Sequence, residues 1–150
     1  MARIKEVSLE MQDCALISLS MEVESLLGVQ PPIDPFAVQD KIEKLLEKIV
    51  AGDQGVPPDE TLVAGLAAFW GMTIAQAFNW QLIAVECDGW RGLGFSDLDR
   101  RYLALPMNYF HELVFNDPQH LIPGPAVRFN AIKASYLPES EPGMYTIITS

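Results

Sequence analysis

Hydrophobic residues in the first part of the chain recur at the spacing of a helix. Between Ser8 and Leu27 they follow one another at intervals near three, four and seven, and Gly28 comes next as a typical helix stop. Alternation of apolar and polar residues from Leu19 to Val23 also fits a half-buried strand, so the pattern leaves this short stretch open. We predict a helix for the segment as a whole.

The next two segments are also predicted to be helical. An Asp-Pro step at 34–35 is typical of a helix start, and the apolar stripe that follows ends before a loop predicted at 53–58. An acidic pair at 59–60 then opens a helix that is apolar on all sides, which indicates a central position in the fold. We therefore expect Phe69 and Trp70 to be largely buried.

Beyond Asn79 the hydrophobic period changes from 3.6 to 2, which predicts a strand from Trp80 to Cys87. Asp88-Gly89 follows, and this dipeptide readily adopts the positive φ angles of a type I′ turn. We expect Trp90 to Phe95 to fold back as the second strand of a hairpin. After a further turn, Tyr102 to Leu105 can add a third strand.

The last part of the chain is predicted to hold one helix and two more strands. A Leu-Pro step precedes the helix at Met107–Phe115, and a strand at Val127–Tyr136 is joined by the turn Pro138–Gly143 to a strand at Met144–Thr149. Short turns between strands favour antiparallel pairing. We expect residues 1–150 to form a single α+β domain: N-terminal helices packed on an antiparallel sheet of about five strands, with one further helix between the strand groups.

The charge of the chain excludes several classes of partner. Its 150 residues include 10 Lys plus Arg and 20 Asp plus Glu, a formal net charge of −10, and the acidic excess is present in both halves. Nucleic acids and anionic membrane surfaces bind proteins through clustered basic residues, so neither is an expected partner. A basic protein would be attracted instead.

Cysteine usage and the apolar runs indicate a cytoplasmic protein. Cys14 and Cys87 lack the spacing of a zinc site, and we expect both to be buried free thiols. The first ten residues lack the apolar stretch of a signal peptide. The apolar run Leu62–Phe78 is slightly shorter than the ~20 residues that a membrane span needs, which favours a buried helix.

The stretch from Leu62 to Val114 combines a helix rich in small residues, Trp80 opening a strand, the Asp88-Gly89 turn and a Leu105-Pro106 step into a helix. This arrangement resembles a family of small bacterial domains of unknown function, which has no assigned activity or site residues. In its size, acidity and scarcity of cysteine, the chain also resembles bacterial immunity proteins. That second resemblance implies a protein partner, a toxin that is bound and blocked.

The case for catalysis rests on two histidines. His111 and Glu112 are neighbours, but adjacent side chains on a helix point about 100° apart and do not face one substrate. Asp117 and His120 could hold a metal together with His111, although Pro118 stiffens the loop between them. We assign no catalytic residue, metal ligand or cofactor, and a small hydrolytic or metal-dependent enzyme using His111 and His120 stays as the alternative.

Basic and aromatic residues interleave in one part of the chain, around the predicted three-stranded meander. Trp, Tyr and Arg are enriched at interface hot spots, and we take as candidate interface residues Trp90, Arg91, Arg100, Arg101, Tyr102 and Tyr109. In the competing interpretation, Trp90 and Tyr102 are ordinary strand aromatics on a half-exposed sheet face.

The leading hypothesis is a non-enzymatic protein-binding module, with toxin neutralisation as one version of it. A structural homo-oligomer stays open as a second alternative. Such an oligomer would pair through the C-terminal run Tyr145–Thr149, which carries no charge to prevent strand pairing.

Overall fold

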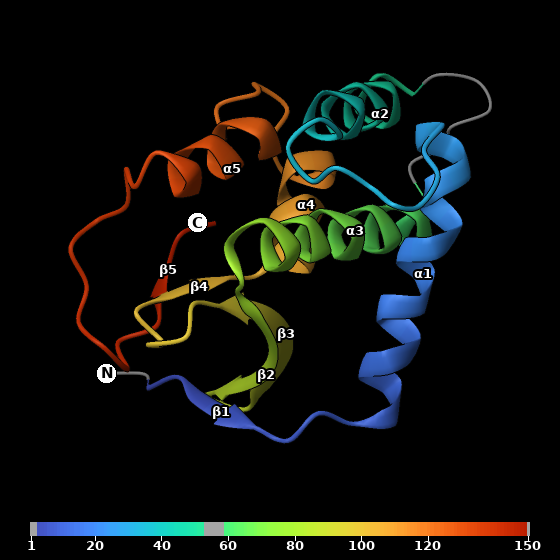
Figure 1. Ribbon diagram of the computed structural model, residues 1–150. Helices are drawn as coiled ribbons and strands as arrows, with labels where there is room; N and C mark the ends of the chain where they lie inside the picture. The colour runs from blue at the N-terminus through green and yellow to red at the C-terminus, as the bar shows by residue number, and fades with distance from the viewer. Residues whose placement is uncertain (1–2, 53–58, 150) are drawn as a thin grey trace.

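The computed structural model describes residues 3–52 and 59–149, and in the view of Figure 1 the helices lie above and to the right of a curved sheet. The loop predicted at 53–58 lies outside the described residues. The helices are α1 (Met11–Leu27), α2 (Gln39–Ala51), α3 (Glu60–Phe78), α4 (Pro106–Phe115) and α5 (Pro125–Lys133), and the strands are β1 (Lys5–Val7), β2 (Gln81–Cys87), β3 (Trp90–Ser96), β4 (Tyr102–Ala104) and β5 (Thr146–Ile147). The expected α+β class is confirmed.

A side-chain cap explains where α3 begins but not where α2 begins. The carboxylate of Asp59 accepts the Thr61 N–H, which starts α3 as predicted. Asp34 accepts the N–H groups of Phe36 and Ala37, but the residues that follow first form a turn, and α2 begins only at residue 39. The residues from Leu19 to Val23, whose pattern fitted either a helix or a strand, are helical throughout and belong to α1.

The sheet has the order β1-β2-β3-β4-β5. The predicted hairpin is present, with Cys87 paired to Trp90 across its turn, and β1 adds an edge strand that the sequence pattern did not indicate. The expectation of a wholly antiparallel sheet is wrong, because β4 and β5 are parallel. Two helices and a long connection separate these strands, and parallel pairing needs such a connection.

The predicted strand at Val127–Tyr136 is also wrong, because most of this segment forms α5. Gly124 is extended and Pro125 occupies the first helical turn, a combination that favours a helix start. Phe129 and Ile132, three residues apart, then lie on one buried face. The expected second hairpin is therefore absent from the described chain, and α4 and α5 both lie between β4 and β5.

Helix α3 runs through the middle of the molecule, between the sheet and α2 (Figure 1). Phe69 is 5% exposed and Trp70 is 0% exposed, which confirms their predicted burial. Glycine at position 71 lets the helix approach β3, because a Cβ there would overlap the ring of Phe95. By length and composition α3 could cross a membrane, yet more than half of it is buried, as in the core helix of a soluble protein.

The two cysteines are free thiols, and Cys14 is exposed. The expectation that both thiols are buried is therefore wrong for Cys14. Helix α1 buries the face that carries Ser20, Val23 and Leu27, and Cys14 lies on the side turned to solvent. Cys87, at the end of β2, is half-buried.

Candidate functional site

The six candidate interface residues do not lie together. Trp90 and Arg91 open β3 beside the hairpin turn, whereas Arg100, Arg101 and Tyr102 lie beyond its other end. The sixth residue, Tyr109, is 2% exposed. Its hydroxyl donates a hydrogen bond to the carbonyl oxygen of Pro123, and burial raises the pKa of this hydroxyl. Tyr109 is therefore a core residue rather than part of a surface.

Each of the three arginines holds two parts of the chain together. Arg91 on β3 forms a salt bridge of 2.7 Å with Asp13 on α1. Arg100 donates from Nε to Glu6 and from Nη2 to Gln81, at 2.8 Å in both cases. Arg101 donates to the carbonyl oxygen of Ser140. These contacts give the three arginines structural roles.

The two remaining aromatic candidates also have contacts within the fold. Trp90 is 36% exposed, and its ring lies over Gly92, where a Cβ would meet the ring atoms at 2.6 Å. The hydroxyl of Tyr102 donates to the carbonyl oxygen of Pro138. The interpretation as ordinary strand aromatics therefore fits Trp90 well, while Tyr102 lines a pocket described below.

The two histidines have separate surroundings. His111 lies on the outer face of α4, with Nε2 4.0 Å from Glu60 Oε1 and its ring 4.8 Å from that of Phe115. His120 lies in the loop between α4 and α5, at a positive φ of 54°. Within residues 3–52 and 59–149, no three His, Cys, Asp or Glu side chains gather in a way that could hold a metal ion.

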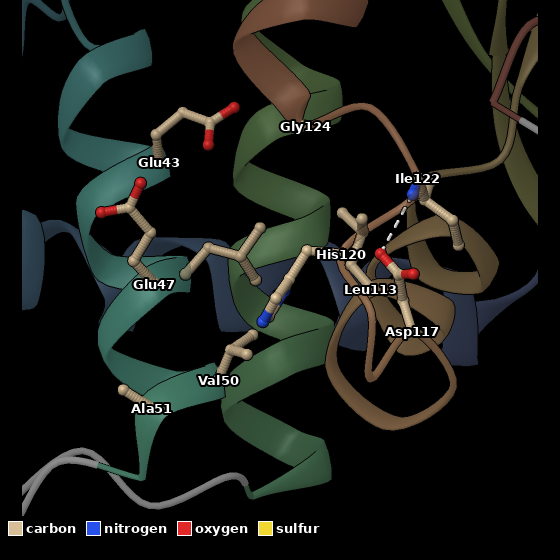
Figure 2. A pocket seen from close by; sticks show the side chains of 10 residues that line it. Glu43, Glu47, Val50, Ala51, Leu113, Asp117, His120, Ile122 and Gly124 are labelled. Atoms are coloured by element: carbon tan, nitrogen blue, oxygen red, sulfur yellow. Dashed lines mark hydrogen bonds between the residues drawn. The ribbon is translucent and has the colours of Figure 1, made fainter.

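A pocket of about 510 Å³ lies between α2 and the loop that joins α4 to α5 (Figure 2). We call it the α2 pocket. Its apolar side chains are Leu46, Val50 and Ala51 from α2, Leu113 from α4 and Ile122 from the loop. Its polar side chains are Glu43, Glu47, Asp117 and His120. The close view shows the two glutamates on α2, with His120 reaching from the opposite side (Figure 2).

One wall of the α2 pocket is a face of α2, and the opposite wall is a loop held in shape by the buried Asp117. Positions 43, 46, 47 and 50 lie on one face of a helix, so the same face of α2 supplies both apolar and acidic side chains. Across from it, Asp117 accepts the N–H groups of Leu121 and Ile122 at 2.8 and 3.1 Å. Asp117 is thus engaged in shaping the loop.

The two glutamates of the α2 pocket differ in what they contact. Glu43 accepts the N–H of Ala126 at 2.8 Å and thereby caps the N-terminus of α5. Glu47 is exposed, and within the described chain its carboxylate has no hydrogen bond or ion pair.

Sequence reasoning named Asp117 and His120 only as possible metal ligands and missed Glu43 and Glu47, although these two glutamates border the apolar stripe of α2. An apolar pocket beside a carboxylate that has no partner among the described residues suits a cation that carries an aliphatic chain, such as a lysine or arginine side chain. Comparison of the chain with protein-family models, with curated proteins and with solved structures finds no match.

Proposed function

We propose that this chain is a non-enzymatic, cytoplasmic protein-binding module that recognises a basic partner through the α2 pocket. The observation that supports this most strongly is Glu47, a carboxylate beside an apolar pocket without a partner among the described residues. A lysine or arginine of the partner would bury its aliphatic stem against Leu46 and Val50 and direct its charge to Glu47.

The overall charge supports the same function. A net charge of −10 raises the rate at which a basic protein meets the domain, because the attraction acts before contact. Toxin neutralisation is one version of this function, in which an acidic domain covers a basic surface that the toxin needs. In that version the partner is a single specific protein rather than a range of basic proteins.

The experiment compares three forms of the chain as bait in cytoplasm from the native source: wild type, Glu47→Lys and Asp40→Lys. Asp40 is an exposed acid on the same helix that does not line the α2 pocket, so it is a matched control for the charge change. We expect wild type and Asp40→Lys to recover the same basic protein and Glu47→Lys to lose it. Thermal melting of each variant checks that all three are folded.

Two results would contradict the proposal. Equal recovery of the partner by both lysine variants would show that the α2 pocket is not the contact. Recovery of no specific protein by folded wild type would remove the proposed function itself. A second copy of the chain, recovered in place of a basic protein, would favour the homo-oligomer.

A further inference from the structure

A second pocket, of about 290 Å³, lies at the C-terminal end of α5 and has aromatic walls. We call it the aromatic pocket. Trp80 comes directly before β2 and Tyr102 opens β4, and both line it. Their rings are almost parallel, with an interplanar angle of 7° and centroids 6.5 Å apart. Phe78, Ile132 and Leu137 add apolar surface.

The carboxylate of Asp97 lines the same pocket. Asp97 follows β3, the strand that lies between β2 and β4 in the sheet. Gln81 pairs with Ser96 and Ser96 pairs with Leu103. Trp80, Asp97 and Tyr102 are the next residues along these three segments, and all three line the pocket. Asp97 Oδ1 accepts the N–H of Tyr102 at 2.9 Å. This bond fixes the direction of the side chain.

The carboxylate of Asp97 has no cationic partner within the described residues. Arg100 is close in sequence, but its Nη1 donates to the backbone carbonyl oxygen of Asp97 at 2.9 Å. Its Nε and Nη2 donate to Glu6 and Gln81. The pocket thus combines two parallel aromatic rings with a carboxylate that has no cationic partner among the described residues.

We propose that the aromatic pocket binds the guanidinium group of an arginine side chain. A cation is attracted to an aromatic ring when it lies within about 6 Å of the ring centroid, and centroids 6.5 Å apart allow one cation to meet this condition for both rings. Guanidinium is planar, stacks on aromatic faces and is less strongly hydrated than an ammonium group. Its N–H groups can donate to Asp97 while its plane lies against a ring.

This inference deepens the proposed function and rests on it for the source of the ligand, since the arginine would belong to the basic partner. The two pockets lie at opposite ends of α5: Gly124, before its first residue, lines the α2 pocket, and Ser135, just beyond its end, lines the aromatic pocket. The partner would therefore engage the domain through two cationic side chains rather than one.

The test uses small probes and needs no partner protein. N-acetyl-arginine amide is titrated into the full chain, and the indole N–H signal of Trp80 is followed by NMR. N-acetyl-lysine amide and N-acetyl-citrulline amide are the comparison probes, because citrulline keeps the planar shape and lacks the charge. We expect saturable binding of the arginine probe, binding of the lysine probe that is several-fold weaker, and no saturable shift with citrulline.

Matched variants locate the binding. Asp97→Asn keeps the oxygen that accepts the Tyr102 N–H but removes the charge. We expect this variant to bind the arginine probe about tenfold more weakly, which is the effect of losing one charge-assisted hydrogen bond. Asp99→Asn removes the same charge two residues away, at an exposed position that does not line the pocket, and should leave binding unchanged. Tyr102→Leu should abolish the Trp80 shift.

The proposal is overturned if arginine and citrulline probes bind equally, if Asp97→Asn and Asp99→Asn behave alike, or if no probe produces a saturable shift. Its failure is distinguishable from failure of the proposed function. A probe that does not bind removes the arginine pocket only, whereas a capture experiment without a partner removes the protein-binding function only.

Discussion

Arg91 and Asp13 join the β2–β3 hairpin to helix α1 through two parallel hydrogen bonds. Nη1 donates to Oδ1 at 2.9 Å and Nη2 donates to Oδ2 at 2.7 Å. Asp13 is 2% exposed and also accepts the N–H of Glu10, and Arg91 further donates to the carbonyl oxygen of Ser8. The pair therefore fixes the first turn of α1 and the chain before it against the sheet.

Replacing Asp13 by Asn should destabilise the protein. Asn retains one acceptor but loses the charge and the paired geometry, so we expect the free energy of unfolding in urea to fall by about 1 to 2 kcal/mol. The matched control is Asp99→Asn, whose exposed carboxylate lies 3.7 Å from Arg101 and which should change it by less than about 0.5 kcal/mol. Equal effects of the two replacements would show that the Asp13 pair behaves as an exposed ion pair.

The same pair makes stability depend on pH at the acidic end. The guanidinium of Arg91 holds the pKa of Asp13 below its ordinary value. The unfolded chain takes up this proton near pH 3.9, about the ordinary value for Asp, and the folded protein does so only at lower pH. The stabilisation is therefore complete above about pH 4 and is lost as the pH falls through the folded pKa.

Urea unfolding of wild type and Asp13→Asn at a series of pH values checks this prediction. The difference in unfolding free energy between the two proteins should be constant near neutral pH and should shrink below about pH 4. A difference that grows on acidification would contradict the lowered pKa.

Truncating Trp70 should cost far more than replacing it by another aromatic residue. Its ring is fully buried against those of Tyr109 and Phe110, so Trp70→Ala should lose about 3 to 5 kcal/mol of stability. Among the described residues its Nε1 has no hydrogen-bond acceptor. Trp70→Phe removes this unpaired donor while keeping an aromatic ring, and should cost much less. A loss below about 1 kcal/mol for Trp70→Ala in urea unfolding would contradict the central position of α3.

Gly71→Ala should destabilise the protein although alanine is the better helix former. On an exposed helix this replacement stabilises by about 1 kcal/mol. Here the new Cβ would overlap the ring of Phe95, which is fully buried, and we expect a net loss of about 1 to 3 kcal/mol. Adding Phe95→Leu should recover part of the loss produced by Gly71→Ala. A gain in thermal stability from Gly71→Ala alone would show that α3 and β3 are not in contact there.

Once a partner has been identified, binding kinetics should separate the long-range effect of charge from the effect of contacts in the α2 pocket. Glu47→Lys and Asp40→Lys change the net charge equally, so both should slow association, and the effect should fade as salt rises because the screening length is about 10 Å at 0.1 M. Only Glu47→Lys should also speed dissociation, since only Glu47 lines the α2 pocket. Surface plasmon resonance at two salt concentrations measures both rates.

Local signals in the sequence account for the elements that were predicted correctly. Asp88-Gly89 defined the hairpin because this turn demands positive φ at both positions, and the structure has φ of 49° and 79° there. The error at α5 was avoidable, since Gly124-Pro125 is itself a helix-start signal.

Pairings between distant segments could not be predicted in the same way. Strand β5 joins β4 across a long connection, and the Leu105 N–H donates to Thr149 Oγ1 across 44 residues. The aromatic pocket likewise depends on Trp80, Asp97 and Tyr102 meeting across three strands. In the α2 pocket, the glutamates were visible as a helix pattern, but the opposite wall depends on how Asp117 shapes its loop.

The edges of the sheet bear on how the protein behaves at high concentration. One edge is β1, only three residues long, in which Lys5 and Glu6 are exposed. The other is β5, two residues long, and in the Tyr145–Thr149 run offered for self-pairing, Ile148 and Thr149 are buried against the fold. Growth of a fibril needs a long, uncharged edge on which the next chain can form its backbone hydrogen bonds. The edges of this sheet are short and partly charged, so another chain cannot pair along them. We therefore expect the folded protein to resist strand-to-strand aggregation when it is concentrated.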